Sequence, residues 1–341
     1  MSAIDWAERG WVPDGLIRWN IRQRLKRKLD TEHVDDVEPQ AARIQALVEA
    51  LTSSPIAVDT DKANEQHYEV AADFFEKVLG RNLKYSSGLW GQGVDTLDAA
   101  EEAMLTVSCE HAQLDNGQRV LELGCGWGSL SLWMAGHYPD SQITAVSNSA
   151  SQKEFIDAKA KALGLNNLAV ITADVNELAL TERFDRVVSV EMFEHVRNYK
   201  QLLNRIGQWL KPDGQLFVHI FCHRFLAYPF EVESDKDWMA RYFFTGGLMP
   251  AADTLLHFQD DLLIDKRWLY SGQHYAKTLR AWLDKMDADR PAVDPTLKAV
   301  YGDDWKVWAQ RWRMFFMACE ELFAYDNGQA WQVAHYRFTR R

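Results

Sequence analysis

The sequence has little cysteine, no long apolar run and no excess of positive charge, and each shortage excludes a class of protein. Its four cysteines (Cys109, Cys125, Cys222 and Cys319) form no C-x-x-C pair, so neither a disulfide framework nor a metal site is expected. No apolar run approaches the roughly eighteen residues of a membrane span, and Met1–Arg9 lacks a signal-peptide pattern. We therefore predict a cytoplasmic protein without stable membrane insertion.

The charge balance and the length narrow the choice further. A formal net charge of −11 argues against a general nucleic-acid-binding protein, because such proteins usually need net positive charge. We expect an N-terminal helical extension over residues 1–62 and a main domain over residues 63–341. The first long helix is rich in arginine and lysine, which leaves open either a solvated face or peripheral contact with anionic lipid. A homodimer also remains open.

The most informative stretch is Val120–Ser129, which reads VLELGCGWGS. Its apolar start predicts the end of a buried strand, and Gly124, Gly126 and Gly128 then make a turn too tight for side chains. Glycine lets the backbone approach a ligand closely, and the helix expected from Ser129 presents free N–H groups at its N-terminus. The stretch therefore predicts a nucleotide- or nucleoside-binding turn.

A dinucleotide is the less favoured ligand of this turn. The dinucleotide fingerprint requires a third glycine where Ser129 stands, and an acidic residue about twenty residues further on. Ser147 and Asn148 occupy that second position. Glu122, two residues before the first glycine, gives the turn an E-x-G-x-G-x-G pattern instead.

Strands and helices alternate along the chain from the glycine turn onward. Apolar runs predict strands at residues 120–123, 143–146, 168–171, 184–190, 216–221, 262–269 and 331–339. Helical patterns separate the first five, which argues for a parallel, doubly wound α/β sheet with ligands at the carboxyl ends of its strands. Residues 222–260 break the rhythm with many aromatic residues and read as a helical, aromatic cap inserted after the fifth strand.

Five motifs together resemble one family. They are Asn64–Tyr68 (NEQHY), Leu121–Ser129, Ser147–Ser149 with Gln152–Phe155, Glu191–His195 (EMFEH) and Arg241–Gly247 (RYFFTGG). With them the chain resembles the plant coclaurine N-methyltransferase family and, more distantly, the cyclopropane fatty acid synthases. The resemblance implies a Rossmann-like, class I S-adenosylmethionine-dependent methyltransferase fold.

The resemblance also implies the cofactor, S-adenosylmethionine, and its binding residues. These are Tyr85, Ser86, Gly124, Gly126, Gly128, Ser147, Asn148, Gln152, Asp174 and Val175. Tyr85 and Ser86 would hold the methionine carboxylate, and Asp174 would lie near the adenine amino group. The place of Asp174 also follows from the residues, because a carboxylate ending the third strand lies beside the glycine turn.

The motif Glu191–His195 follows the fourth strand and should face the methyl group across the glycine turn. Methyl transfer from a sulfonium to an amine needs mainly positioning and the removal of one proton. Glu191 and Glu194 are expected to orient an ammonium, and His195, with an ordinary pKa near 6.5, to take its proton. The alternative is structural, with these side chains paired to Arg186 or Arg197.

The acceptor site is the least determined. Trp312 and Phe315 match aromatic pocket residues of the plant enzymes, but Arg311 stands where those enzymes have tyrosine. A cation there would repel an amine unless it points away. With His219 and Tyr275, these residues form the expected acceptor site for a small aromatic amine resembling a tetrahydroisoquinoline or benzylisoquinoline.

The alternative activity is cyclopropanation of unsaturated acyl chains in phospholipids. Glu194, His219 and Tyr275 match bicarbonate-site residues of the cyclopropane synthases, whereas Ser87 stands where those enzymes carry a cysteine. The serine counts against this activity without excluding it. A non-catalytic cofactor-binding protein is a third reading, disfavoured by the intact acid and base residues.

Overall fold

The computed structural model describes residues 2–32, 36–58, 72–232, 234 and 237–341. The motif Asn64–Tyr68 and the expected domain boundary between residues 62 and 63 lie outside the described residues, and that division remains a prediction.

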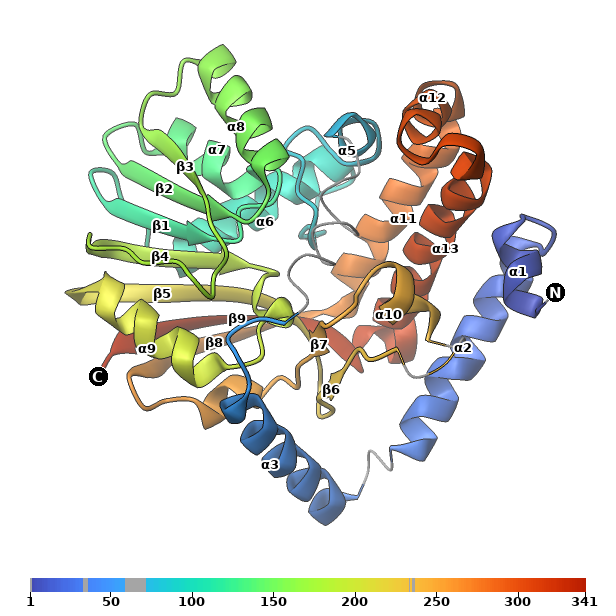
Figure 1. Cartoon of the computed structure of the whole chain (residues 1–341), viewed down its shortest axis with the longest axis horizontal. Coiled ribbons are helices and arrows are strands. Elements are labelled where there is room, and N and C mark those ends of the chain that lie inside the picture. Colours follow the sequence, from blue (N-terminus) through green and yellow to red (C-terminus); the bar gives the residue numbers. More distant parts are fainter. Residues whose placement is uncertain (1, 33–35, 59–71, 233, 235–236) are drawn as a thin grey trace.

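Seven strands of the described chain form one sheet, in the order β3-β2-β1-β4-β5-β9-β8 (Figure 1). The strands are β1 (Arg119–Leu123), β2 (Gln142–Ser147), β3 (Leu168–Thr172), β4 (Phe184–Val190), β5 (Leu210–His223), β8 (Leu262–Ser271) and β9 (Trp331–Arg340). The first five in sequence are parallel, and β9 lies antiparallel between β5 and β8. This confirms the doubly wound α/β prediction. The strand order reverses between β1 and β4, where such sheets bind their ligands.

Helices cover both faces of the sheet because alternate residues of each central strand point to opposite sides. On one face, β4 and β5 pack with α9 (Tyr199–Trp209), with α3 (Val37–Ser53) beyond it. On the other face lie α6 (Leu97–His111) and α7 (Ser129–His137). The helix α8 (Ala150–Leu163) packs on β2 and β3 at one end of the sheet.

Residues 211–214 form a bulge inside β5. Phe184 pairs with Leu210, whereas Arg186 pairs with Gln215, so the register jumps across the intervening residues. Proline and glycine in this stretch disfavour continuous pairing.

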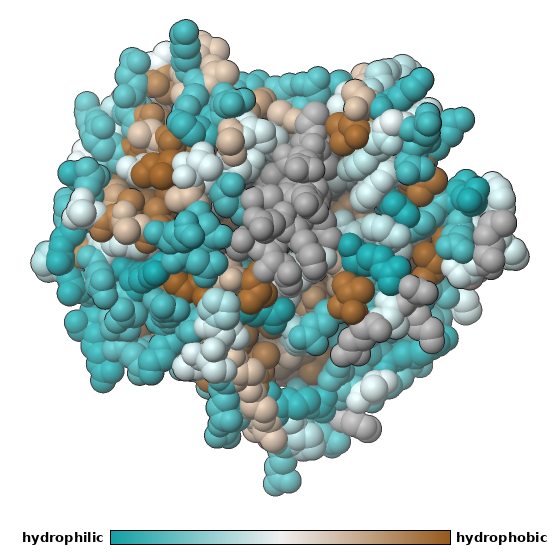
Figure 2. Space-filling model, in the orientation of Figure 1, coloured by the Kyte–Doolittle hydropathy of each residue, from teal (hydrophilic) through white to brown (hydrophobic). Residues whose placement is uncertain are grey.

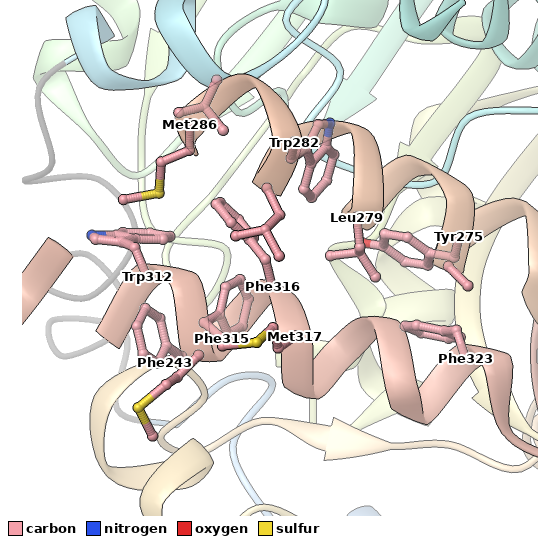
Figure 3. Close-up of a cluster of buried hydrophobic side chains, with 14 of the residues drawn as sticks. Phe243, Tyr275, Leu279, Trp282, Met286, Trp312, Phe315, Phe316, Met317 and Phe323 are labelled. Carbon is pink, nitrogen blue, oxygen red and sulfur yellow. The ribbon is translucent and has the colours of Figure 1, made fainter. Parts of the chain in front are cut away.

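A second helical layer stands over the carboxyl ends of the strands. It consists of α11 (Gly272–Ala288), α12 (Arg290–Tyr301) and α13 (Trp305–Ala324), with α5 (Ala72–Val78) against them. Their apolar faces meet in an aromatic cluster between α11 and α13 (Figure 3). The outer surface of the molecule is largely hydrophilic in the face shown in Figure 2.

The inserted cap is less helical than predicted. Its described residues hold one short α-helix, α10 (Trp238–Tyr242), a 3-10 turn at Thr254–His257, and a two-stranded sheet of β6 (Tyr228–Pro229) and β7 (Leu248–Met249). Aromatic residues of the cap nevertheless pack against the α11–α13 cluster, as Phe243 does on Phe315 with ring centroids 4.4 Å apart.

The N-terminal helices α1 (Ala3–Glu8) and α2 (Asp14–Thr31) lie along α13 (Figure 1). Arg18 forms ion pairs of 2.9 Å with both Glu320 and Glu321, and Arg22 pairs with Glu321 at 2.9 Å. Part of the basic surface of α2 is thus used for docking. No helix among the described residues is long and apolar enough to cross a membrane.

Candidate active site

The glycine turn joins β1 to α7 as predicted. Gly124, Gly126 and Gly128 all have positive φ, at 79°, 52° and 81°, a backbone conformation that side chains rarely adopt. A Cβ at Gly124 would lie 2.5 Å from Met192 Cγ, and one at Gly128 would lie 2.7 Å from Ile156 Cγ1. A Cβ at Gly126 would meet nothing within 4 Å, so this glycine faces open space.

Two cavities meet at this turn. The larger, of about 200 Å³, lies between the turn and the second helical layer. The smaller, of about 80 Å³, runs along the carboxyl ends of β2 and β3. Gly124, Gly126, Gln152, Met192 and His195 line both of them. One elongated ligand can therefore occupy both cavities by passing the glycine turn.

The smaller cavity is lined by the polar residues expected near a nucleoside. Ser147 Oγ donates a hydrogen bond of 2.6 Å to Gln152 Oε1. Gln152 Nε2 is buried and finds no hydrogen-bond acceptor among the described residues, which leaves a donor for a ligand. Asn148 and Val175 also line this cavity. Asp174 lies beside it and accepts a 2.7 Å hydrogen bond from the N–H of Asn176, but Ala173 and Val175 form the wall itself.

The loop before α6 brings Tyr85 and Ser86 to the larger cavity, together with a residue that the sequence reading missed. Lys84 is 2% exposed, donates a 2.9 Å hydrogen bond to the Ser87 carbonyl and contacts Ser86 Oγ. Burial lowers the pKa of Lys84 to about 8, although the carboxyls of Glu191 and Glu101 oppose this shift. The only sign of this burial in the sequence is that Lys84 stands among small and apolar residues.

Glu191 is the centre of the polar contacts in the larger cavity. It follows β4 with a left-handed backbone (φ 49°) and receives a hydrogen bond from Tyr275 Oη at 2.7 Å. The N–H of Ser87 and Nε2 of His219 both lie 3.2 Å from its other oxygen. Burial raises the pKa of Glu191 to about 7, with Lys84 and Tyr275 acting against the shift. The side chain of Glu191 is thus held by these groups, and Arg186 instead donates hydrogen bonds to backbone carbonyls.

The expected convergence of two carboxylates on one ammonium is not what the structure shows. Glu191 lines the larger cavity, but Glu194 does not line either cavity described above. The short turn Phe193–His195 directs Glu194 back toward β5, where it accepts a 2.7 Å hydrogen bond from the N–H of Phe221. Burial and the nearby charge of Glu191 raise the pKa of Glu194 well above its usual value, which favours the neutral acid. Any catalytic role of Glu194 would thus be indirect.

His195 lies where the two cavities meet, with its ring stacked on Phe244 at a centroid distance of 4.8 Å. Burial lowers its pKa to about 4, despite the opposing effect of Glu191. His195 is therefore a neutral imidazole near pH 7 and a weaker base than its ordinary pKa suggested.

The aromatic wall of the larger cavity comes from α11 and α13 (Figure 3). Phe315 and Tyr275 line the cavity, and Tyr275 stacks on Phe323 with ring centroids 4.4 Å apart. Trp312 is fully buried one layer behind, with its ring 5.8 Å from that of Phe315. Trp312 thus supports the wall and does not form its surface.

Arg311 points away from the cavity. Its guanidinium contacts Glu8 of α1 at 3.0 and 3.1 Å, donates to Tyr242 Oη at 3.0 Å and lies 4.0 Å from the Tyr242 ring centre. The positive charge is therefore neutralised between α1, α10 and α13. Arg311 therefore does not repel an amine in the cavity, which was the concern stated from the sequence.

Comparisons with known proteins identify the family of the chain. The family model for mycolic acid cyclopropane synthetase matches residues 58–333. The (S)-coclaurine N-methyltransferase of Thalictrum flavum subsp. glaucum is 38% identical over 339 residues, covering 98% of this chain and 94% of the relative. The cyclopropane-fatty-acyl-phospholipid synthase of Escherichia coli K12 is 30% identical over 276 residues, covering 80% of this chain and 67% of the relative.

A solved structure extends the likeness to the whole fold. The crystal structure of coclaurine N-methyltransferase bound to N-methylheliamine and SAH superposes with a TM-score of 0.95 at 36% identity, covering 98% of both chains. The predicted family resemblance is thereby confirmed. The chain belongs to the mycolic acid cyclopropane synthetase family and is an S-adenosylmethionine-dependent methyltransferase.

Proposed function

We propose that this enzyme methylates the nitrogen of a tetrahydroisoquinoline- or benzylisoquinoline-like amine. The observation that carries the proposal is Glu191, a buried acid that lines a cavity walled by Phe315, Tyr275 and other aromatic rings. A carboxylate attracts an ammonium group, and aromatic faces favour a flat, partly cationic body. The names of the relatives and the N-methylheliamine in the similar crystal structure support the same acceptor class.

The two cavities would hold different parts of the ligands. The nucleoside part of S-adenosylmethionine would lie in the smaller cavity beside Ser147 and Gln152, and its methionine part would pass Gly126 toward Tyr85 and Ser86. The open space at Gly126 and the unused donor of Gln152 fit such a ligand. When bound, the cofactor supplies a methyl group on a positively charged sulfur.

The protein's own chemistry is the removal of a proton. An aliphatic amine has a pKa near 10 and arrives mainly as an ammonium, which has no free lone pair. Glu191, with a pKa raised to about 7, can hold the ammonium and accept one proton from it. His195, with a pKa near 4, is better suited to orienting the acceptor than to keeping its proton.

Cyclopropanation is the second candidate, because a cyclopropane synthase is among the relatives and the family model carries that name. The contacts of Glu191 favour the amine. Tyr275 and His219, which would serve a bicarbonate site, both hydrogen-bond to Glu191 itself. The N–H of Ser87 contacts the same carboxyl group.

The test is an acceptor screen with the purified chain and S-adenosylmethionine. Tetrahydroisoquinolines, phenethylamines and vesicles of unsaturated phospholipid would be supplied separately, and products identified by mass spectrometry. We expect a mass gain of one methyl group on an amine of the first two sets. Conversion of the lipid to a cyclopropane with no amine methylated would overturn the proposal in favour of the second candidate.

A further inference from the structure

A row of aligned residues crosses the sheet from the active site toward β8. Glu191 follows Val190 of β4, and Val190 pairs with His219 of β5. His219 pairs directly with His335 of β9, and His335 pairs with Trp268 of β8. The histidines point to the face that α6 covers, because their strand neighbours Val218 and Tyr336 pack on the opposite side.

His111, the last residue of α6, closes the row. Its ring stacks on Trp268 with centroids 3.7 Å apart and an interplanar angle of 10°. Its Nδ1 lies 3.0 Å from His335 Nδ1. His111 is only half-buried, so this end of the row reaches the solvent-accessible surface.

Hydrogen bonds connect the row without a gap. Glu191 Oε1 and His219 Nε2 are 3.2 Å apart, and His219 Nδ1 and His335 Nε2 are 2.8 Å apart. Both nitrogens of each buried imidazole are therefore taken up within the row. His219 and His335 are 0% exposed, so two polar rings are buried at positions where an apolar side chain would cost less desolvation free energy.

We propose that His219, His335 and His111 relay to solvent the proton that Glu191 takes from the amine. This inference rests on the proposed amine methylation. In each turnover the ammonium N–H bond breaks and the proton binds the Glu191 carboxylate. The three histidines are then positioning and relay residues that act through Glu191.

The relay step balances with one proton entering and one leaving. Glu191 passes its proton to His219 Nε2, the Nδ1 proton of His219 passes to His335 Nε2, and the Nδ1 proton of His335 passes to His111 Nδ1. His111 then releases a proton from Nε2 to water. Each ring ends neutral with its proton on the other nitrogen. Each ring then flips back to its starting orientation before the next cycle.

The surroundings keep the relay rings neutral. Burial lowers the pKa of His219 and His335 well below the usual value, and lowers that of His111 to about 4. A proton reaching His111 is therefore readily released. The titratable and charged groups that face the row are Lys84, Glu194, His195, Tyr270, Tyr275, Cys319 and Arg337.

The experiment compares pH profiles of kcat/KM for a cyclic secondary amine from pH 6 to about 10. His335→Phe interrupts the row in the middle, and His111→Phe interrupts it at the surface while keeping an aromatic ring on Trp268. Phe217→Leu is the matched control, because Phe217 packs on His335 with centroids 5.0 Å apart but donates and accepts nothing.

We expect kcat/KM of both histidine variants to fall about tenfold or more at pH 7. This loss is a fraction of the rate acceleration that a general base contributes. The loss should shrink toward pH 10, where about half of the amine is already unprotonated. Phe217→Leu should follow the wild-type profile. In His111→Ala, added imidazole should restore activity by replacing the missing ring, whereas His111→Phe should not respond.

Two results would overturn the relay while leaving amine methylation intact. One is variant profiles that run parallel to the wild type at every pH, as a merely structural role would give. The other is a His111→Ala variant with full activity and no response to imidazole. If His335→Phe fails to fold, the His111 variants still test the relay. A wild-type enzyme that methylates no amine would instead remove the proposed function.

Discussion

The two walls of the larger cavity are built by opposite means. The wall at the end of β1 is backbone, where Gly124 leaves no room for a side chain and Gly126 has a positive φ that side chains rarely adopt. The wall on α11 and α13 is made of large side chains, such as Phe315 and Tyr275. A backbone wall fits one ligand and tolerates little change, whereas a side-chain wall can be reshaped residue by residue. Cofactor choice is thus fixed at one wall and acceptor choice adjustable at the other.

The largest effect should come from Glu191, which stands between the walls. Glu191→Gln keeps the size and the backbone but removes the proton acceptor, so kcat should fall about 10²–10⁴-fold. Affinity for S-adenosylhomocysteine, measured by calorimetry, should stay within a few-fold. A variant that keeps more than about a tenth of wild-type kcat would show that another group takes the proton.

A side chain on the backbone wall should mainly affect the cofactor. Gly126→Val places a branched side chain in the space where the two cavities meet, so affinity for S-adenosylhomocysteine should fall about a hundredfold, roughly 2.7 kcal/mol. Gly164→Val is the matched control, since Gly164 also has a positive φ (70°) and an open Cβ position but ends α8 far from the cavities. Equal loss of affinity in both variants would attribute the effect to backbone strain.

The pH dependence should follow the acid between the walls. Because the pKa of Glu191 is raised to about 7, its proton-accepting carboxylate is present above that pH and is lost as the pH falls through it. We expect kcat to drop about tenfold for each unit below pH 7, measured with saturating substrates. A midpoint near 4 would point to His195 as the base.

A substitution in the side-chain wall should change the binding of the amine and leave the binding of the cofactor unchanged. Phe315→Leu keeps an apolar residue but removes the aromatic face, so KM for the amine should rise a few-fold, at a stability cost of about 1.5 kcal/mol or less. Affinity for S-adenosylhomocysteine should be unchanged. A change in cofactor affinity alone would contradict the division between the two walls.

The smallest effect is expected outside the wall, at Arg311. Arg311→Gln removes a cation that contacts Glu8 and Tyr242 and points away from the cavity. KM for the amine should therefore stay within about twofold, while thermal unfolding should reveal a loss of about 1–3 kcal/mol, because Glu8 loses its ion-pair partner and keeps a hydrogen bond from Trp238 Nε1. A large fall in KM would mean that Arg311 does repel the amine.

The backbone wall was readable from the sequence because it is local. The turn Val120–Ser129 carries its strand, its glycines and its helix in ten consecutive residues, and all three formed as predicted. Strand positions were likewise readable from apolar runs. The bulge at residues 211–214 and the strands of the cap were not, because both depend on pairing partners elsewhere in the chain.

The rest of the site depends on register and direction, which the sequence does not carry. His219 reads as a histidine in an apolar strand, and only the insertion of β9 beside β5 sets His335 opposite it. The inward turn of Glu194 and the outward turn of Arg311 depend on partners far along the chain, Phe221 and Glu8. The burial of Lys84 likewise depends on residues elsewhere in the chain, Glu101 of α6 and Glu191 after β4.

The left-handed backbone of Glu191 has a consequence for selection by heat. A residue with a side chain at φ 49° stores about 1–2 kcal/mol that glycine would release. In variants selected for thermal survival alone, glycine at this position would gain that energy but leave the Tyr275 hydroxyl and the Ser87 N–H without their acceptor, so it should not accumulate. Heat should therefore select for the same acid that turnover requires, because its hydrogen bonds hold the strained peptide unit in place.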